Sequence, residues 1–217
     1  MSADFSTPES RASAARTDSR FHLELRSVTD SLCESYALER RRIWLREKSG
    51  REGGLGNAIP LPFPFCRRYI VRYHRYMRHA NALELRGLFA HELMHVQHYA
   101  RASYFDLQGF MLRYALFGVT EGLADGIGRD WVRSLEHLTD LMAIHRGEGA
   151  AIAAWKRFKN QLIADGLLAD SWADMYITDA EVEALIEDPD ALRRCIESCL
   201  VVLRARHPLQ PFRRDAA

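Results

Sequence analysis

The amino-acid sequence contains no apolar run that approaches the roughly 20 residues needed to span a bilayer, which argues against a membrane protein. Residues 1–20 have no apolar h-region either, so they do not form a secretory signal peptide. Asp4, Glu9 and Asp18 argue in addition against a transit peptide. We therefore expect a disordered tail over residues 1–20 and a cytoplasmic protein by default, with export by a dedicated secretion system left open.

The chain also lacks a strong charge of either sign. Its 30 basic and 29 acidic side chains leave a net charge of +1, without the basic surplus that wholesale nucleic-acid binding requires. The local exception is the stretch of residues 67–79, where arginines are interleaved with tyrosines and histidines. Such a stretch can bind single-stranded nucleic acid, but a scaffold or cleft edge is the interpretation we favour. We do not expect nucleic acid as a partner.

Cysteine pairs with the CxxC spacing of metal or redox sites are absent. The four cysteines are Cys33, Cys66, Cys195 and Cys199. Cys195 and Cys199 are one helical turn apart, which is also the spacing of two buried residues on a helix. We expect all four to be reduced structural thiols, in a reducing compartment.

Helical periodicity is the dominant pattern of the chain. With 47% apolar and 27% charged residues, the composition is that of a globular domain. We expect one domain over residues 21–206, followed by a loose C-terminal tail over residues 207–217. The pattern predicts helices over residues 27–48, 81–102, 110–116, 121–145, 148–164, 179–187 and 191–206. The fold class is therefore mainly α, with at most a small β-sheet near residues 60–78, where strand and helix patterns compete.

The sequence HELMH over residues 91–95 lies within the strongest of these helical patterns. At about 100° per residue, His91 and His95 project about 40° apart and roughly opposite the apolar Phe89 and Leu93. Two imidazoles one turn apart can bind a tetrahedral Zn²⁺ at about 2.0–2.1 Å each. Glu92 projects about 100° away, which suits a water held at the open position of the metal. The motif thus predicts two zinc ligands and a general base.

A catalytic zinc site needs a third protein ligand. The metzincin spacing HExxHxxGxxH is not met, and His98 is a poor choice because one rigid helix rarely supplies three donors to one ion. Glu121 and Asp125 lie one turn apart further along, among small residues that would let two helices approach closely. We expect Glu121 to complete a His₂Glu set and Asp125 to accept a hydrogen bond from a ligating histidine, which would fix its tautomer.

HELMH followed by the segment EGLAD at residues 121–125 resembles the gluzincin group of zinc metallopeptidases. It is more similar still to small zincin-like peptidases, including plant basic secretory proteins, which carry HExxH and then EG-x-AD. The resemblance covers only residues 85–130. It implies a zincin-like fold in which the HExxH helix packs on a second, ligand-bearing helix. It also implies His91, His95 and Glu121 as zinc ligands, Glu92 as the base and Asp125 as the partner of a ligating histidine.

An alternative third ligand comes from a second resemblance. Residues 122–128 are similar to the GTxDxxYG segment of aspzincins, in which the aspartate binds the metal, although the threonine and the tyrosine of that pattern are absent here. Asp125 would then replace Glu121 as the ligand. We favour Glu121 and keep Asp125 as the alternative.

The function expected from these residues is zinc-dependent hydrolysis of peptide bonds, with a protein or peptide as substrate and Zn²⁺ as the cofactor. A non-catalytic zincin-fold module that serves binding or regulation is the alternative. A peptidase directed to nucleic-acid-bound substrates by the arginines of residues 67–79 is a third. The sequence indicates no membrane partner and no particular oligomeric state.

Overall fold

A computed structural model describes residues 18–48, 54–61, 68–102, 127–169 and 175–205. Its helices are α2 (Asp18–Ser35), α3 (Ala82–Arg101), α5 (Ile127–Ala143), α6 (Gly149–Ala164), α7 (Asp179–Glu187) and α8 (Pro189–Ala205), and its strands are β1 (Ile43–Lys48), β2 (Gly56–Pro60) and β3 (Tyr69–His74). The described part of the chain is thus mainly helical with a small sheet, as predicted. No helix within it has both the length and the apolar character needed to cross a membrane.

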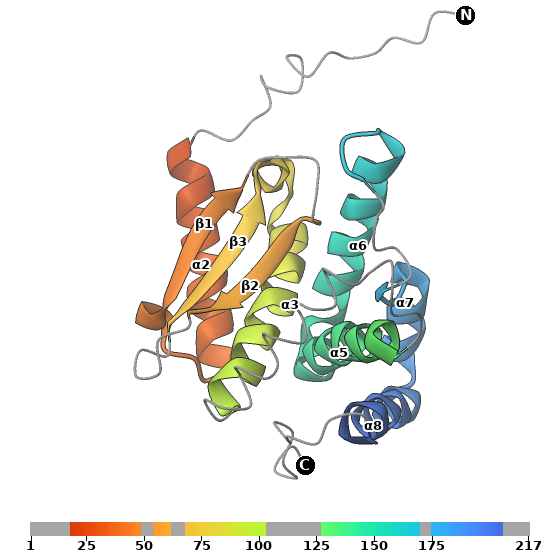
Figure 1. Cartoon of the computed structure of the whole chain (residues 1–217). Coiled ribbons are helices and arrows are strands. Elements are labelled where there is room, and N and C mark those ends of the chain that lie inside the picture. Colours follow the sequence, from red (N-terminus) through yellow and green to blue (C-terminus); the bar gives the residue numbers. More distant parts are fainter. Residues whose placement is uncertain (1–17, 49–53, 62–67, 103–126, 170–174, 206–217) are drawn as a thin grey trace, which may run out of the picture.

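The three strands form a mixed sheet in the order β1-β3-β2. Strand β1 runs parallel to β3, with Trp44 beside Ile70, whereas β2 runs antiparallel to it. Residues 69–74 of the arginine-bearing segment form the central strand and residues 75–79 form a 3₁₀-helix, while β2 is an edge strand that lies against α3. Helices α2 and α3 cover one face of the sheet, while α5 to α8 gather on the other side of α3 (Figure 1). Helix α3 thus lies at the centre of the molecule.

The single helix predicted over residues 27–48 is wrong in its second half. Helix α2 ends at Ser35, and Ala37 adopts a left-handed conformation with a φ of 54°. The N–H of Leu38 donates to the carbonyl of Cys33, 2.8 Å away, which closes the helix in the manner of a Schellman motif. Residues 43–48 then form strand β1, because pairing with β3 outweighs a helical pattern that depended on apolar spacing alone.

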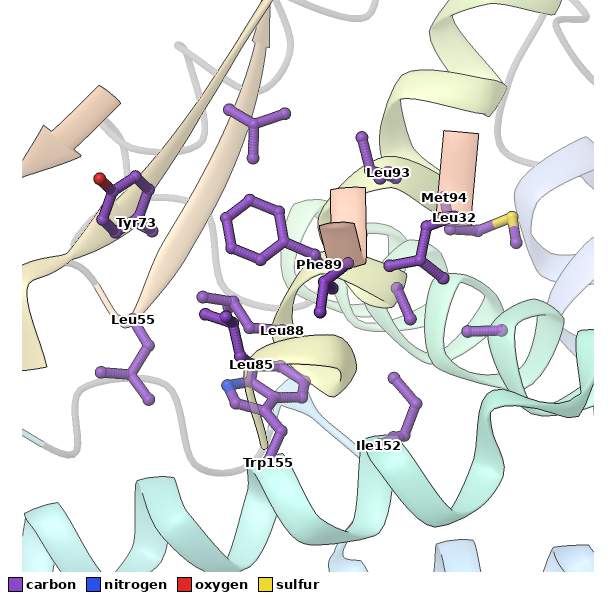
Figure 2. Close-up of a cluster of buried hydrophobic side chains, with 14 of the residues drawn as sticks. Leu32, Leu55, Tyr73, Leu85, Leu88, Phe89, Leu93, Met94, Ile152 and Trp155 are labelled. Carbon is purple, nitrogen blue, oxygen red and sulfur yellow. The ribbon is translucent and has the colours of Figure 1, made fainter. Parts of the chain in front are cut away.

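Helix α3 agrees with its prediction. Asn81 caps the helix by accepting hydrogen bonds from the N–H groups of Leu83 and Glu84, and the Glu84 carboxylate accepts one from the N–H of Asn81. The apolar residues predicted to lie opposite the histidines, Phe89 and Leu93, are fully buried, and Phe89 packs against Tyr73 of β3, with ring centroids 6.0 Å apart. Figure 2 shows this contact and the packing of the same helix against Trp155 and Ile152 of α6. Burial on both sides places the histidine face inside the protein rather than in solvent.

The C-terminal helices also follow the periodicity, and α6, α7 and α8 match their predicted ranges closely. Asp188 ends α7, and its carboxylate accepts hydrogen bonds from the N–H groups of Asp190 and Ala191 in the first turn of α8. The long helix predicted over residues 121–145 corresponds to α5, which begins in the described residues at Ile127. The helix predicted over residues 110–116 lies outside the described residues.

Gly87 of α3 sets how closely α3 and α6 approach each other. A methyl group there would lie 2.0 Å from the carbonyl oxygen of Ala151 and 2.7 Å from the Cβ of Trp155. We predict that Gly87→Ala lowers the free energy of unfolding by about 3 kcal/mol or more, because the obstacle is backbone of a packed helix. Gly149→Ala is the control, since its methyl would meet side-chain atoms of Ile186 and Ile144 and no backbone, and its effect should be smaller than that of Gly87→Ala, at about 1 kcal/mol. Chemical denaturation of both variants measures the difference, and equal losses would contradict it.

A candidate metal centre between two helices

Three side-chain atoms converge on one point between α3 and α5. The Nε2 atoms of His91 and His95 are 3.2 Å apart, and the Oε2 atom of Glu136 lies 3.1 Å from the first and 3.3 Å from the second. All three side chains are buried, with exposed fractions between 2% and 6%. Among the described residues, this group alone places three or more such donors close enough to share a metal ion.

Helix geometry explains the arrangement. His91 and His95 are one turn apart on α3, so their rings lie together, with centroids 4.8 Å apart. Helix α5 packs beside them and presents Glu136 and, one turn later, Asp140. Carboxylate and imidazole groups from two packed helices therefore meet in the space that α3 and α5 enclose.

When both rings are neutral, the contacts at their Nδ1 atoms leave each Nε2 atom with a lone pair. Asp140 is acceptor-only, so the Nδ1 atom of His91, 2.8 Å from its Oδ1, carries a proton. The hydroxyl of Thr139 donates to the carbonyl of Leu135, 2.8 Å away, and is left as an acceptor for the Nδ1 proton of His95, 3.4 Å away. Two neutral rings in this arrangement would direct their Nε2 lone pairs toward each other and toward the carboxylate of Glu136. The repulsion among these groups is relieved only by a bound cation or by a proton.

The dimensions of the group fit a tetrahedral zinc ion. With bonds of about 2.0–2.1 Å, any two donors of such an ion lie about 3.3–3.4 Å apart, close to the 3.1–3.3 Å observed. Two imidazole nitrogens and one carboxylate oxygen are also a donor set that zinc accepts in catalytic sites. Asp140 completes the arrangement by orienting His91 from the opposite ring nitrogen.

Electrostatics favour a positive charge at this point. Burial lowers the pKa of His91, but Asp140 and Glu136 outweigh it and raise that pKa to about 10. Burial raises the pKa of Glu136, whereas the neighbouring His95 and His91 lower it further, so the carboxyl stays ionised well below its usual range. Without a metal, a proton on His91 and the ammonium group of Lys156 together balance the negative charges of Asp140 and Glu136.

A zinc ion bound at this group would have to displace that proton, so its affinity should depend on pH. Because the pKa of His91 is raised to about 10, the metal-free ring is protonated at pH 6, 7 and 8 alike. We predict that the zinc affinity rises about tenfold for each pH unit over this range, since one proton is released on binding. Competition with a chelating dye at the three pH values measures it. An affinity that does not change with pH would show that the ring is already neutral.

Glu92 lies on the same helix but faces the sheet. Its side chain is 4% exposed, and a methyl group on Gly56 of β2 would lie only 2.4 Å from its Oε1. Its Oε2 atom is buried and accepts no hydrogen bond from the described residues. Burial raises the pKa of Glu92 above its usual value, although His91 and His95 oppose the shift. An unsatisfied carboxylate with a raised pKa, next to two potential ligands, is the state expected of a general base.

Of the residues predicted from the sequence, the structure brings His91 and His95 together, and it places Glu92 on the same helix with its side chain against Gly56 of β2. Glu121 and Asp125, the predicted third ligand and its alternative, lie outside the described residues. Sequence reasoning missed Glu136 and Asp140. The sequence did contain a pattern that could have identified them, because Glu136 and Asp140 have the same ExxxD spacing, one helical turn, as Glu121 and Asp125.

The chain matches no family model, no curated protein and no solved structure. Its function is therefore inferred from the geometry of this group and of the residues around it.

Proposed function

We propose that this protein is a zinc-dependent peptidase whose metal is bound by His91, His95 and Glu136. One observation carries the proposal: three atoms of metal-ligating type, two imidazole nitrogens and one carboxylate oxygen, converge in a buried space at distances of 3.1–3.3 Å from one another. Three protein ligands leave the fourth position of a tetrahedral ion for water, as in catalytic rather than structural sites. The donor set and the HExxH spacing on α3 agree with the gluzincin resemblance of the sequence.

Zinc in such a site acidifies a bound water and polarises a substrate carbonyl. Glu92 is the residue of this chain that would take the proton from the attacking water and pass it to the leaving amine. Its buried, unpartnered Oε2 is available for that proton, and its raised pKa brings the group closer to working pH. Asp140 would keep the His91 ring in the tautomer that presents Nε2.

An extended peptide is the substrate that the surroundings of Glu92 support. Strand β2 is an edge strand paired only with β3 in the described sheet, and its residue Gly56 contacts Glu92. An edge strand offers a row of backbone donors and acceptors to an extended chain. A peptide paired there would bring its carbonyl groups alongside α3, where the base lies.

Metal content and hydrolysis, measured together, test the proposal. Metal-depleted protein is titrated with zinc, the bound metal is quantified after dialysis, and the same samples are incubated with casein and a peptide library. We expect one zinc per chain and cleavage that returns only with zinc. No stoichiometric metal would refute the site.

Stoichiometric zinc without cleavage would instead indicate the second candidate, a non-catalytic binding or regulatory module. Near-complete burial of the three donors is the observation that favours this candidate, because structural zinc sites are closed to solvent.

A further inference from the structure

A buried lysine stands behind the metal centre. Lys156 of α6 is only 5% exposed, and its Nζ donates to the Oδ2 atom of Asp140, 2.7 Å away. The other oxygen of the same carboxylate, Oδ1, accepts from the Nδ1 of His91, 2.8 Å away. A continuous chain of contacts therefore runs from Lys156 through Asp140 to His91, and it approaches the ring from the side opposite Glu136.

The ammonium group of Lys156 is held in place by more than this ion pair. It lies over the rings of Trp155 and Tyr176, 5.1 and 5.3 Å from their centroids. Aromatic faces attract a cation at such distances. Helix α6 is itself held close to α3 at Gly87. Lysine is rarely buried unless it is paired, and Asp140 is the carboxylate that pairs with Lys156 here.

We propose that Lys156 is a positioning residue of the metal centre, which fixes the Asp140 carboxylate and through it the His91 ring. A buried carboxylate with one partner can rotate, whereas two partners on its two oxygens define its plane. The His91 Nδ1 then has a single acceptor direction, and Nε2 is directed toward His95 and Glu136. This role rests on the proposed function only in that His91 is a metal ligand.

Zinc affinity in a double-mutant cycle tests the coupling. The variants are Lys156→Met, which removes the charge at similar size, Asp140→Asn, and the two combined. We expect each single variant to weaken zinc binding by about tenfold to a hundredfold. The combined variant should be no weaker than Asp140→Asn alone, because Lys156 acts through Asp140. If the loss of zinc affinity in the combined variant equals the product of the two single losses, the proposal is overturned.

Lys159→Met is the matched control on the same helix. Its ammonium also lies over the Tyr176 ring, 4.4 Å from the centroid, but Asp140 takes its hydrogen bond from Lys156. We expect this variant to bind zinc within about twofold of the wild type, a change far smaller than the loss expected at an orienting partner. A loss equal to that of Lys156→Met would assign the effect to the general charge of this region and overturn the proposal.

Nuclear magnetic resonance of the metal-free protein gives a readout that does not depend on zinc or on hydrolysis. With ¹⁵N-labelled histidine, the Nδ1 proton of His91 should give a slowly exchanging signal in the wild type. The signal should broaden or vanish in Lys156→Met and return in Lys156→Arg, whose guanidinium can still donate to Asp140. An unchanged signal in Lys156→Met would refute the positioning role.

These outcomes separate the proposal from the proposed function. A wild type that binds zinc but cleaves nothing would leave the affinity cycle fully informative. A wild type that binds no zinc would overturn the role in a metal centre, and the ring signal would then report only whether Lys156 fixes the His91 ring. If Lys156→Met does not fold, the ring signal is measured instead in two other variants. These are Lys156→Arg and the combined variant, which removes both buried charges. The proposal then requires a weak ring signal in the combined variant and a clear ring signal in Lys156→Arg.

Discussion

Glu92→Gln is expected to reduce peptide hydrolysis by about 10²- to 10⁴-fold while one zinc per chain remains bound. Glutamine has nearly the same shape but cannot accept the proton of the attacking water. The metal should stay because the carboxylate of Glu92 is not one of the three converging donors. Steady-state cleavage of a peptide substrate and metal content of the same sample give the two measurements.

Stability provides an internal check on Glu92→Gln. The raised pKa of Glu92 means that its ionised form is disfavoured in the fold, so removing the charge should not lower the melting temperature. Glu84→Gln is the control on the same helix, since glutamine also serves at that position of a capping box. Cleavage by Glu92→Gln at the rate of the Glu84→Gln control would rule out the general-base role.

Glu136→Gln is expected to weaken zinc binding by about a hundredfold or more. The change removes both a donor of high affinity and the negative charge that lies 3.1 Å from His91 and 3.3 Å from His95. Loss of a group that only orients a ligand already costs about tenfold to a hundredfold, so loss of a ligand should exceed that. Chelator competition at constant pH measures the affinity.

Glu121→Gln is the comparison that decides between the two carboxylates. If Glu136 completes the donor set, Glu121→Gln should bind zinc like the wild type. A larger loss for Glu121→Gln than for Glu136→Gln would restore the ligand first expected from the sequence and would make Glu136 a neighbour of the site. Asp125→Asn, measured in parallel, tests the remaining alternative in the same way.

The elements whose formation depends on local signals were predictable. Helix α3 follows from its capping pair, Asn81 and Glu84, and from the apolar stripe that includes Phe89. The break between α7 and α8 follows from Asp188 and the proline after it. Such features involve residues within one or two turns of each other, so the sequence shows them directly.

Strand β1 and the third donor could not be predicted in the same way, because both depend on partners far along the chain. Residues 43–48 become a strand by pairing with β3, some 26 residues later. The ExxxD spacing occurs twice after HELMH, and the sequence offers no local means to choose between Glu121 and Glu136. Which helix crosses beside His91 is settled by packing between helices that are distant in sequence.

The sequence by itself determined two histidines and a glutamate on one helix, since a spacing of four residues places both imidazoles on one face whatever surrounds them. Only the tertiary structure brought Glu136 to within 3.1–3.3 Å of both rings and aligned Lys156, Asp140 and His91 behind them. The physical reason is that these distances depend on how closely separate helices pack: Glu136 and Asp140 come from α5, and Lys156 comes from α6, which the absence of a side chain at Gly87 allows to lie close to α3.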